Sequence, residues 1–281
     1  MIKILYFIYQ IFIALPIFLV STVLICTTII IGCSIGNAHF WSNWPGKIWS
    51  YIVCYSLLLP VKVKRNPNVK KDTSYVFVAN HQGAFDIFLI YGFLGHHFKW
   101  LMKVGLRKLP LIGKASEAAG HIFVDKSGPR KILATIMHAR KVLKGGMSLV
   151  IFAEGSRSFT GHMGEFKRGA FQLADQLQLP IVPITLNGPF DVLSRTAKWP
   201  SWHPLTMTIH DPIYPQCKGE ENVNRMMEES YKVIMSGLPE KYQGTVENPD
   251  QLNIQNAIPH PNGIFFEPIY VHECSMYITF K

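Results

Sequence analysis

The chain has 281 residues, enough for one large domain or two small ones. Hydrophobic residues make up 48% and charged residues only 16%, and this low charge content indicates membrane contact. The net charge is +10, but the sequence lacks a helix-turn-helix, zinc-finger or aromatic RNA-binding pattern, which argues against nucleic acid as the partner. Five cysteines without a Cys-x-x-Cys pair argue against a disulfide framework or a zinc site and favour a reduced compartment.

A long apolar segment comes first in the chain. No charged residue occurs between positions 4 and 36, and Pro16 lies inside this run. As one helix it would be about 50 Å long, which exceeds a hydrocarbon core of about 30 Å. It is therefore one tilted span, a helix kinked at Pro16 or a shallow re-entrant pair. We expect a retained membrane anchor, because the run is too long for a signal peptide and no cleavage site follows it.

Residues 40–46 contain two tryptophans and are typical of an interface turn. Residues 48–60 form a second apolar segment, too short to span as a helix, which lies on the membrane or packs on the body. We therefore predict a helical membrane anchor over residues 1–60. A basic cluster follows, which favours the cytoplasmic side and attraction to anionic lipid; it contains Lys62, Lys64, Arg65, Lys70 and Lys71.

Strand-like and helix-like segments alternate over residues 61–244. Strands are expected at residues 75–79, 98–102, 121–124, 147–152, 181–186 and 205–210. Helices are expected at residues 85–95, 105–119 with a break at Pro110, 129–143 with Ser127 as a candidate cap, 168–177 and 222–235. This order predicts an α/β domain with a mainly parallel central sheet flanked by helices. Residues 245–281 form a tail without a recognisable pattern, to which we assign no role.

The strand at residues 75–79 ends in Asn80 and His81, and Asp86 follows five positions after the histidine. On one continuous helix these two side chains would point apart. They meet only if His81 lies in the turn before a helix and Asp86 in its first turn. Asp86 can then accept the Nδ1 proton of His81 and leave Nε2 as a general base. The alternative is a turn histidine beside an aspartate that caps the helix.

A second polar cluster follows the strand at residues 147–152. Gly155 allows close approach of a ligand to the backbone, and Arg157 offers a planar fork that suits phosphate. Lys167 and Arg168 open the next helix and add positive charge. Glu154 is a candidate partner for a substrate hydroxyl or for an arginine. Arg157 alone is most often a surface ion-pair residue, but the cluster favours a phosphate site.

Two lysines, Lys103 and Lys126, follow other strands and can face developing charge or a phosphate, although each alone is usually a solvated lysine. A metal site is not expected, because His81 has no His or Cys partner at ligand spacing. We expect no cofactor.

The residues jointly resemble the 1-acylglycerol-3-phosphate acyltransferases among the glycerolipid acyltransferases. Four blocks carry the resemblance over residues 60–215: Asn80-His81-x4-Asp86, residues 120–126, residues 152–158 with 166–171 after them, and residues 181–184. The resemblance implies transfer of a fatty acyl group from acyl-carrier protein or coenzyme A to lysophosphatidic acid, giving phosphatidic acid in phospholipid synthesis at the membrane.

Under this resemblance His81 is the general base and Asp86 orients it. Glu154, Gly155 and Arg157 hold the glycerol phosphate, and Pro183 shapes the donor side. The motif neighbours Asn80 and Ser156, together with Lys103, Lys126, Lys167 and Arg168, complete the expected substrate-binding set.

The sequence departs from the family pattern at two positions. Ala153 stands where the family usually has proline, and Lys126 stands where it usually has arginine, so the charge stays but the bidentate fork is lost. These departures leave another lysolipid or an amino-acid lipid open as acceptor. Two other classes also remain: a catalytically silent protein that binds anionic membranes, and a histidine-based lipid hydrolase, for which the sequence offers no adjacent nucleophile.

Overall fold

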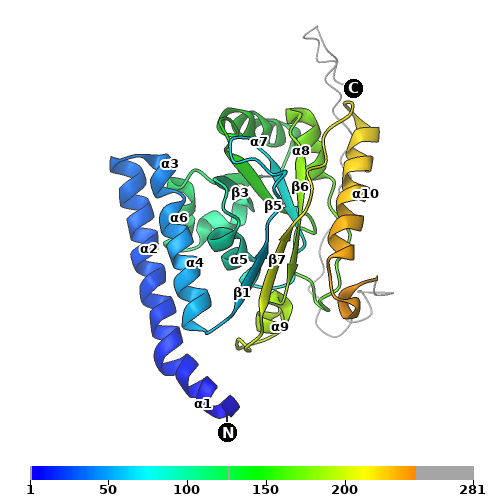
Figure 1. The fold of residues 1–281 in the computed structure, drawn as a ribbon. Coiled ribbons are helices and arrows are strands. Elements are labelled where there is room, and N and C mark those ends of the chain that lie inside the picture. Colours follow the sequence, from blue (N-terminus) through cyan, green and yellow to red (C-terminus); the bar gives the residue numbers. More distant parts are fainter. Residues whose placement is uncertain (1, 126, 245–281) are drawn as a thin grey trace.

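A computed structural model describes residues 2–125 and 127–244 of the chain. Within this part a central sheet is covered by helices on both faces, and a long N-terminal helix runs along one side (Figure 1). This architecture is the α/β arrangement that the alternating sequence pattern predicts.

The sheet of the described residues has the strand order β1-β7-β6-β2-β5-β3-β4. All neighbours are parallel except β6 and β7, which are antiparallel. Because β2, β5, β3 and β6 run the same way, their carboxyl ends lie at one edge of the sheet, which we call the carboxyl edge. The strands are β1 (Val61–Lys64), β2 (Val76–Ala79), β3 (Phe98–Lys103), β4 (Ile122–Val124), β5 (Ser148–Phe152), β6 (Ile181–Asn187) and β7 (Leu205–Ile209).

Two apolar layers bury the two faces of the sheet. One layer packs helices α4 (Trp44–Ser56) and α5 (Phe85–Phe93) against alternate strand residues such as Phe77 and Val150. The other layer packs α7 (Pro129–Val142), α8 (Gly169–Leu177) and α10 (Glu220–Ser236) against residues such as Val78 and Ile151. The central strand β2 is therefore apolar at every position, as expected for a parallel strand covered on both sides.

Shorter helices connect these layers. They are α3 (Ala38–Trp41), the 3₁₀ turns η2 (Val104–Lys108) and η3 (Glu240–Tyr242), α6 (Ile112–Ala118) and α9 (Pro189–Leu193).

The N-terminal apolar segment is helical from Ile2 to Ile35: α1 (Ile2–Tyr9), a π-turn η1 (Gln10–Ala14) and α2 (Leu15–Ile35). In the described part of the chain it is the one helix long and apolar enough to cross a membrane. The irregular turn ends just before Pro16, which has no backbone N–H to donate to the helical hydrogen bonds.

The body also packs against this helix. α2 lies beside α4 and α6, and Ala14 belongs to the same buried cluster as Val53 and Leu57 (Figure 1). α4 in turn packs on α5, so the second apolar segment of the sequence packs on the body.

The structure adds elements that the sequence pattern does not predict. β1 lies in the basic stretch after the second apolar segment, where Lys62 and Lys64 alternate with valines at the edge of the sheet. Arg65 is no free surface charge, because its guanidinium donates to the carbonyls of Phe93 and Leu94 at the end of α5. The prediction that Ser127 caps α7 is wrong, because Gly128 is the residue that precedes the helix and no side chain caps it.

Replacing Arg65 with alanine should lower stability, because the last carbonyls of α5 lose their charged donor. We expect a cost of about 1–2 kcal/mol, hence a fall in Tm of several degrees in detergent micelles. Lys64→Ala is the matched control, since Lys64 is exposed and changes at such sites stay within about 0.5 kcal/mol. Equal Tm values for the two variants would contradict this role of Arg65.

Candidate active site

His81 and Asp86 meet at the carboxyl edge. His81 follows β2, and Asp86 lies in the first turn of α5, so the turn between them folds the two side chains together. The His81 Nδ1 atom lies 2.7 Å from Asp86 Oδ2, and the Gly83 amide donates to the same oxygen at 2.9 Å. Asp86 is fully buried; burial raises its pKa, whereas the contact with His81 acts in the opposite direction. The predicted pair is therefore formed.

The imidazole ring of His81 stacks on Phe152 at the end of β5. The ring centroids are 3.9 Å apart and the planes differ by 7°, and Trp100 of β3 also stacks on Phe152. Nδ1 is occupied by Asp86, and within the described residues Nε2 has no hydrogen-bond partner. The aromatic row thus fixes the ring plane while one nitrogen remains free to act on a ligand. The sequence analysis did not identify Phe152, although it directly precedes the second polar cluster.

Glu154 holds the backbone of His81 in place. Its Oε1 accepts from the His81 amide at 2.7 Å and its Oε2 accepts from the Gly164 amide at 2.8 Å. Burial raises the pKa of Glu154 to about 7, although both amide hydrogen bonds oppose that shift. Both carboxylate oxygens are thus engaged within the protein, an arrangement that differs from the expected contact with a substrate hydroxyl or an arginine.

The turn after Glu154 also holds His81 from the other side. The Ser158 amide donates to the His81 carbonyl at 2.8 Å, and the Gln82 side chain donates to the carbonyl of Gly161. Ser158 Oγ in turn organises the following loop by donating to the His162 carbonyl. These contacts bind the two strand ends into one unit. Sequence reasoning missed Gln82, Ser158 and Gly164, because no local pattern marks such long-range contacts.

Gly83 is required by a close approach of α9. A Cβ built on Gly83 would lie 2.3 Å from the Pro189 carbonyl oxygen and 2.7 Å from that of Leu193. The Ala84 amide donates to the same Leu193 carbonyl. The turn between His81 and Asp86 is therefore packed against the backbone, and it is not the loose turn that a glycine alone would indicate.

Three of the predicted cationic residues lie on the turns that follow the strands at the carboxyl edge. Lys103 ends β3, Arg157 lies in the turn after β5, and the stem of Lys167 passes beside Gly155. None of the three makes an ion pair or side-chain hydrogen bond within the described residues. Arg168 differs, since it pairs with Glu220 at 3.0 Å. Lys126 lies outside the described residues.

Register places Lys103 level with the residue that precedes His81. Ala79 pairs with Phe152, and Trp100 pairs with Val150, so Lys103 and Asn80 both extend to the level of Ala153. Two strand spacings, roughly 10 Å, separate β2 from β3. A molecule of the size of a glycerol phosphate can therefore reach both.

The remaining predicted residues occupy distinct positions. The Asn80 amide bonds both the carbonyl and the N–H of Leu186, which extends the pairing of β2 with β6. Gly155 adopts a φ of +72° and Ser156 beside it is exposed. Pro183 is buried inside β6 opposite Val78, three residues before His81 in register. The structure therefore does not place Pro183 beside the catalytic pair, and the binding roles of these residues stay predictions.

Ala153 shows what its departure from proline does. Its amide donates to the carbonyl of Ala79 at 3.2 Å, a bond that a proline has no N–H to make. Its carbonyl accepts from the Lys167 amide. Ala153 thereby continues the pairing of β2 with β5 by one residue.

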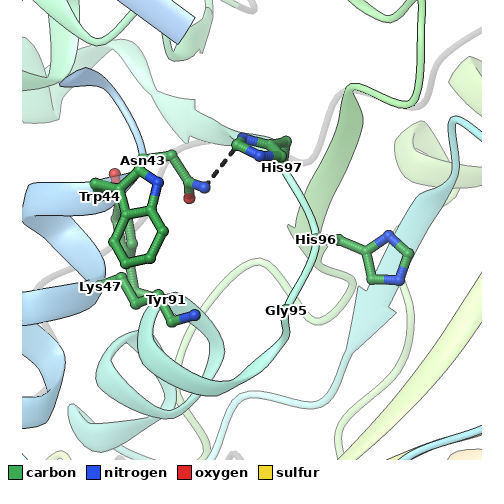
Figure 2. Close-up of a pocket in the computed structure, with 7 residues that line it drawn as sticks. All are labelled: Asn43, Trp44, Lys47, Tyr91, Gly95, His96 and His97. Atoms are coloured by element: carbon green, nitrogen blue, oxygen red, sulfur yellow. Dashed lines mark hydrogen bonds between the residues drawn. The ribbon is translucent and has the colours of Figure 1, made fainter. Parts of the chain in front are cut away.

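A separate pocket of about 100 Å³ lies near the start of β3, at the opposite edge of the sheet, where α4 begins (Figure 2). Asn43 contacts His97 Nδ1 at 3.0 Å, whereas His96 points away toward the aromatic rings of Tyr75 and Phe77. The described residues contain no cluster of three metal-ligating side chains. This pocket is thus not part of the catalytic constellation.

Comparison with known proteins finds similarity to acyltransferases over the part of the chain that carries this site. Residues 60–187 match a family model described as Acyltransferase. A chloroplastic 1-acyl-sn-glycerol-3-phosphate acyltransferase of Brassica napus is 32% identical over 170 residues, which cover 60% of this chain and 49% of the relative. The enzyme of the same name from Saccharomyces cerevisiae is 31% identical, over 57% of this chain and 54% of the relative. The chain therefore spans about half the length of the curated relatives it matches.

A solved structure shares the fold. The crystal structure of the 1-acyl-sn-glycerophosphate acyltransferase of Thermotoga maritima aligns with a TM-score of 0.70 at 21% identity, over 84% of this chain and 97% of the other. At this identity the likeness concerns the fold. The matched segment contains the His81–Asp86 pair and the Glu154 turn, so the chain is similar to acyltransferases over the part that carries the candidate site.

Proposed function

We propose that the protein transfers a fatty acyl group from an acyl thioester to the sn-2 hydroxyl of lysophosphatidic acid, giving phosphatidic acid. The observation that carries the proposal is the His81–Asp86 pair, whose Nε2 is free, at the edge of the sheet that also carries unpaired cations. No serine or cysteine side chain contacts His81 within the described residues, so the nucleophile has to come from the substrate. The names of the relatives support the same acceptor for this chain.

The reaction follows from the geometry. His81 Nε2 takes the proton of the acceptor hydroxyl, and the oxygen attacks the thioester carbonyl carbon. The tetrahedral intermediate collapses, the carbon–sulfur bond breaks, and the thiolate takes the proton back from His81. Asp86 stabilises the transient imidazolium and holds the Nδ1 tautomer. The thioester is already activated, so a covalent enzyme intermediate is not needed.

The cations at the carboxyl edge match the charges of this reaction. The acceptor carries a phosphate, for which the Arg157 fork is a suitable partner, and Lys167 adds a cation beside Gly155 in the same turn. Lys103, or backbone amides near it, is suited to the oxyanion that forms on the carbonyl oxygen. The apolar N-terminal helix suits an acceptor and product that reside in lipid. We place the protein at the membrane with its catalytic body on the cytoplasmic face, where acyl-carrier protein or coenzyme A thioesters are available.

Removing the base should abolish transfer. Purified His81→Ala should form phosphatidic acid at least about a hundredfold more slowly than wild type, the lower range for loss of a general base. The assay supplies lysophosphatidic acid with each donor type, acyl-carrier protein and coenzyme A. His138→Ala is the matched control, since His138 is an exposed helix residue, and it should keep full activity. If His81→Ala forms as much product as wild type, His81 is not the general base. Release of free fatty acid in the absence of an acceptor would indicate a hydrolase.

Arg157 should recognise the phosphate of the acceptor. Arg157→Lys loses the bidentate fork, so we expect KM for lysophosphatidic acid to rise about tenfold or more with a smaller change in kcat. Monoacylglycerol, which lacks the phosphate, should react slowly with both enzymes and at the same rate. A second acceptor panel of lysophospholipids tests the alternative headgroups. A higher rate on one of them than on lysophosphatidic acid would overturn the acceptor proposed here.

Glu154 should impose a pH dependence. Its pKa of about 7 lies above the ordinary value, so it is ionised, and able to accept both amide bonds, only above about pH 7. We expect kcat to rise as pH increases through 7, and this rise should be smaller in Glu154→Gln, which has a lower plateau because an amide accepts at one oxygen only. Because the pKa of Glu154 is raised in the folded protein, this group stabilises the fold at low pH, and the contribution is lost as pH rises through about 7. Unfolding therefore does not explain a lower kcat on the acid side of pH 7. An unchanged acid limb in the variant would contradict this role.

A further inference from the structure

A run of exposed residues follows β3. Every residue from position 103 to position 110 is exposed, and the run contains large apolar side chains. Val104, Leu106, Leu109 and Ile112 are 38%, 41%, 44% and 42% exposed. We call these four residues the η2–α6 patch. Clustered exposure of this kind in a short segment is typical of an interaction surface.

The segment that carries the patch is tightly packed. The Leu109 amide donates to Leu106, and the Gly113 amide donates to Leu109. A Cβ on Gly113 would lie 2.2 Å from the Arg107 carbonyl oxygen, so the two turns touch through their backbones. Arg107 also pairs with Glu117 of α6 at 2.6 Å. The apolar side chains are therefore held outward by an ordered backbone.

Positive charge flanks the patch. Lys108 and Lys114 are exposed and make no ion pair within the described residues, whereas Arg107 is occupied by Glu117 and by the ring of Phe123. Apolar side chains between free lysines match the interface of an anionic bilayer, where the apolar groups enter the acyl boundary and the lysines meet lipid headgroups.

The patch also continues an apolar surface. α6 packs on α2 through Ala115 and Ala119, which contact Cys26 and Ile29, and Leu111 lies against the same cluster. The outward side of α2 carries exposed residues such as Val23, Leu24 and Ile31. Helix α2 and α6 lie next to each other on one side of the molecule (Figure 1). α6 therefore joins the segment that carries the patch to the long apolar helix.

The end of this surface lies near the base. Lys103 directly precedes the patch and stands two strand spacings, roughly 10 Å, from β2, which leads into His81. A bilayer that touches the patch thus comes within reach of the catalytic pair.

We propose that the η2–α6 patch is a bilayer contact that seats the carboxyl edge on an anionic lipid surface, so that an acceptor in the bilayer reaches His81 without leaving the lipid. The proposal rests on the proposed function for the identity of the acceptor. It adds a second contact beyond the N-terminal helix, and this contact directly follows Lys103 at the carboxyl edge. Met137 and Leu133 on α7 are also exposed, but they lie on a different helix and provide a matched comparison.

The first test measures how deeply a fluorophore at a single position enters the bilayer. Leu109→Cys and Met137→Cys carry an environment-sensitive fluorophore, in a background with Cys217→Ser and Cys274→Ser. On vesicles of anionic phospholipid, the label at Leu109 should shift to the blue and be quenched by brominated acyl chains. The label at Met137 should stay in water. A Leu109 label that stays in water while the protein is vesicle-bound would overturn the proposal.

The second test separates binding from chemistry. The triple variant Leu106→Ser, Leu109→Ser and Ile112→Ser is compared with the double variant Leu133→Ser and Met137→Ser. The triple variant should lose about tenfold in kcat/KM on lysophosphatidic acid embedded in anionic vesicles, and should match wild type on a short-chain acceptor below its micelle concentration. The double variant should match wild type on both acceptors.

Other outcomes are decisive as well. Equal loss on vesicles and on the monomeric acceptor would mean that the patch supports the fold or the site, and would refute the bilayer contact. A triple variant with wild-type rates on vesicles would refute it directly. A change in oligomeric state in detergent would assign the patch to a contact between copies. Failure of wild type on both acceptors would instead count against the proposed function, and the fluorescence test would still stand.

Discussion

The buried carboxylate of Glu154 is the contact on which the catalytic end of the sheet depends. It accepts from the backbone amides of His81 and Gly164, so the ends of β2 and β5 are joined through one side chain. Burial of this group is unfavourable for its charged form, which is why its pKa lies near 7. The two amides would otherwise lack partners, and that cost favours keeping the carboxylate in place.

The Glu154 contact is one of several that hold His81 in a fixed position. His81 is held at its backbone by Glu154 and Ser158, at its ring face by Phe152 and at Nδ1 by Asp86. Only Nε2 is left for a ligand. Positioning of this kind lowers the entropy that a reaction between two substrates has to lose at the active site.

The strand and helix order was predictable from the sequence, since the apolar runs and the glycine or proline boundaries are local signals. The His81–Asp86 pair was predictable for the same reason, because a turn followed by the start of a helix brings together two side chains that are five positions apart. Glu154 was identified as functional, but its partners were not, because the Gly164 amide and the His81 amide carry no side-chain signal. Strand β1 was not predicted. Its exposed lysines, Lys62 and Lys64, alternate with valines at the edge of the sheet, and in the sequence they were interpreted as a basic cluster beside the membrane.

The packing of the N-terminal helix has a consequence for how the protein is made. Ala14 completes a cluster that also contains Val53, Leu57 and Phe85, and α2 covers part of α6. A segment that is synthesised before the body is thus part of the core of that body. The body acquires its full core only when this helix is available beside it, so docking of the helix and folding of the body are steps of a single process.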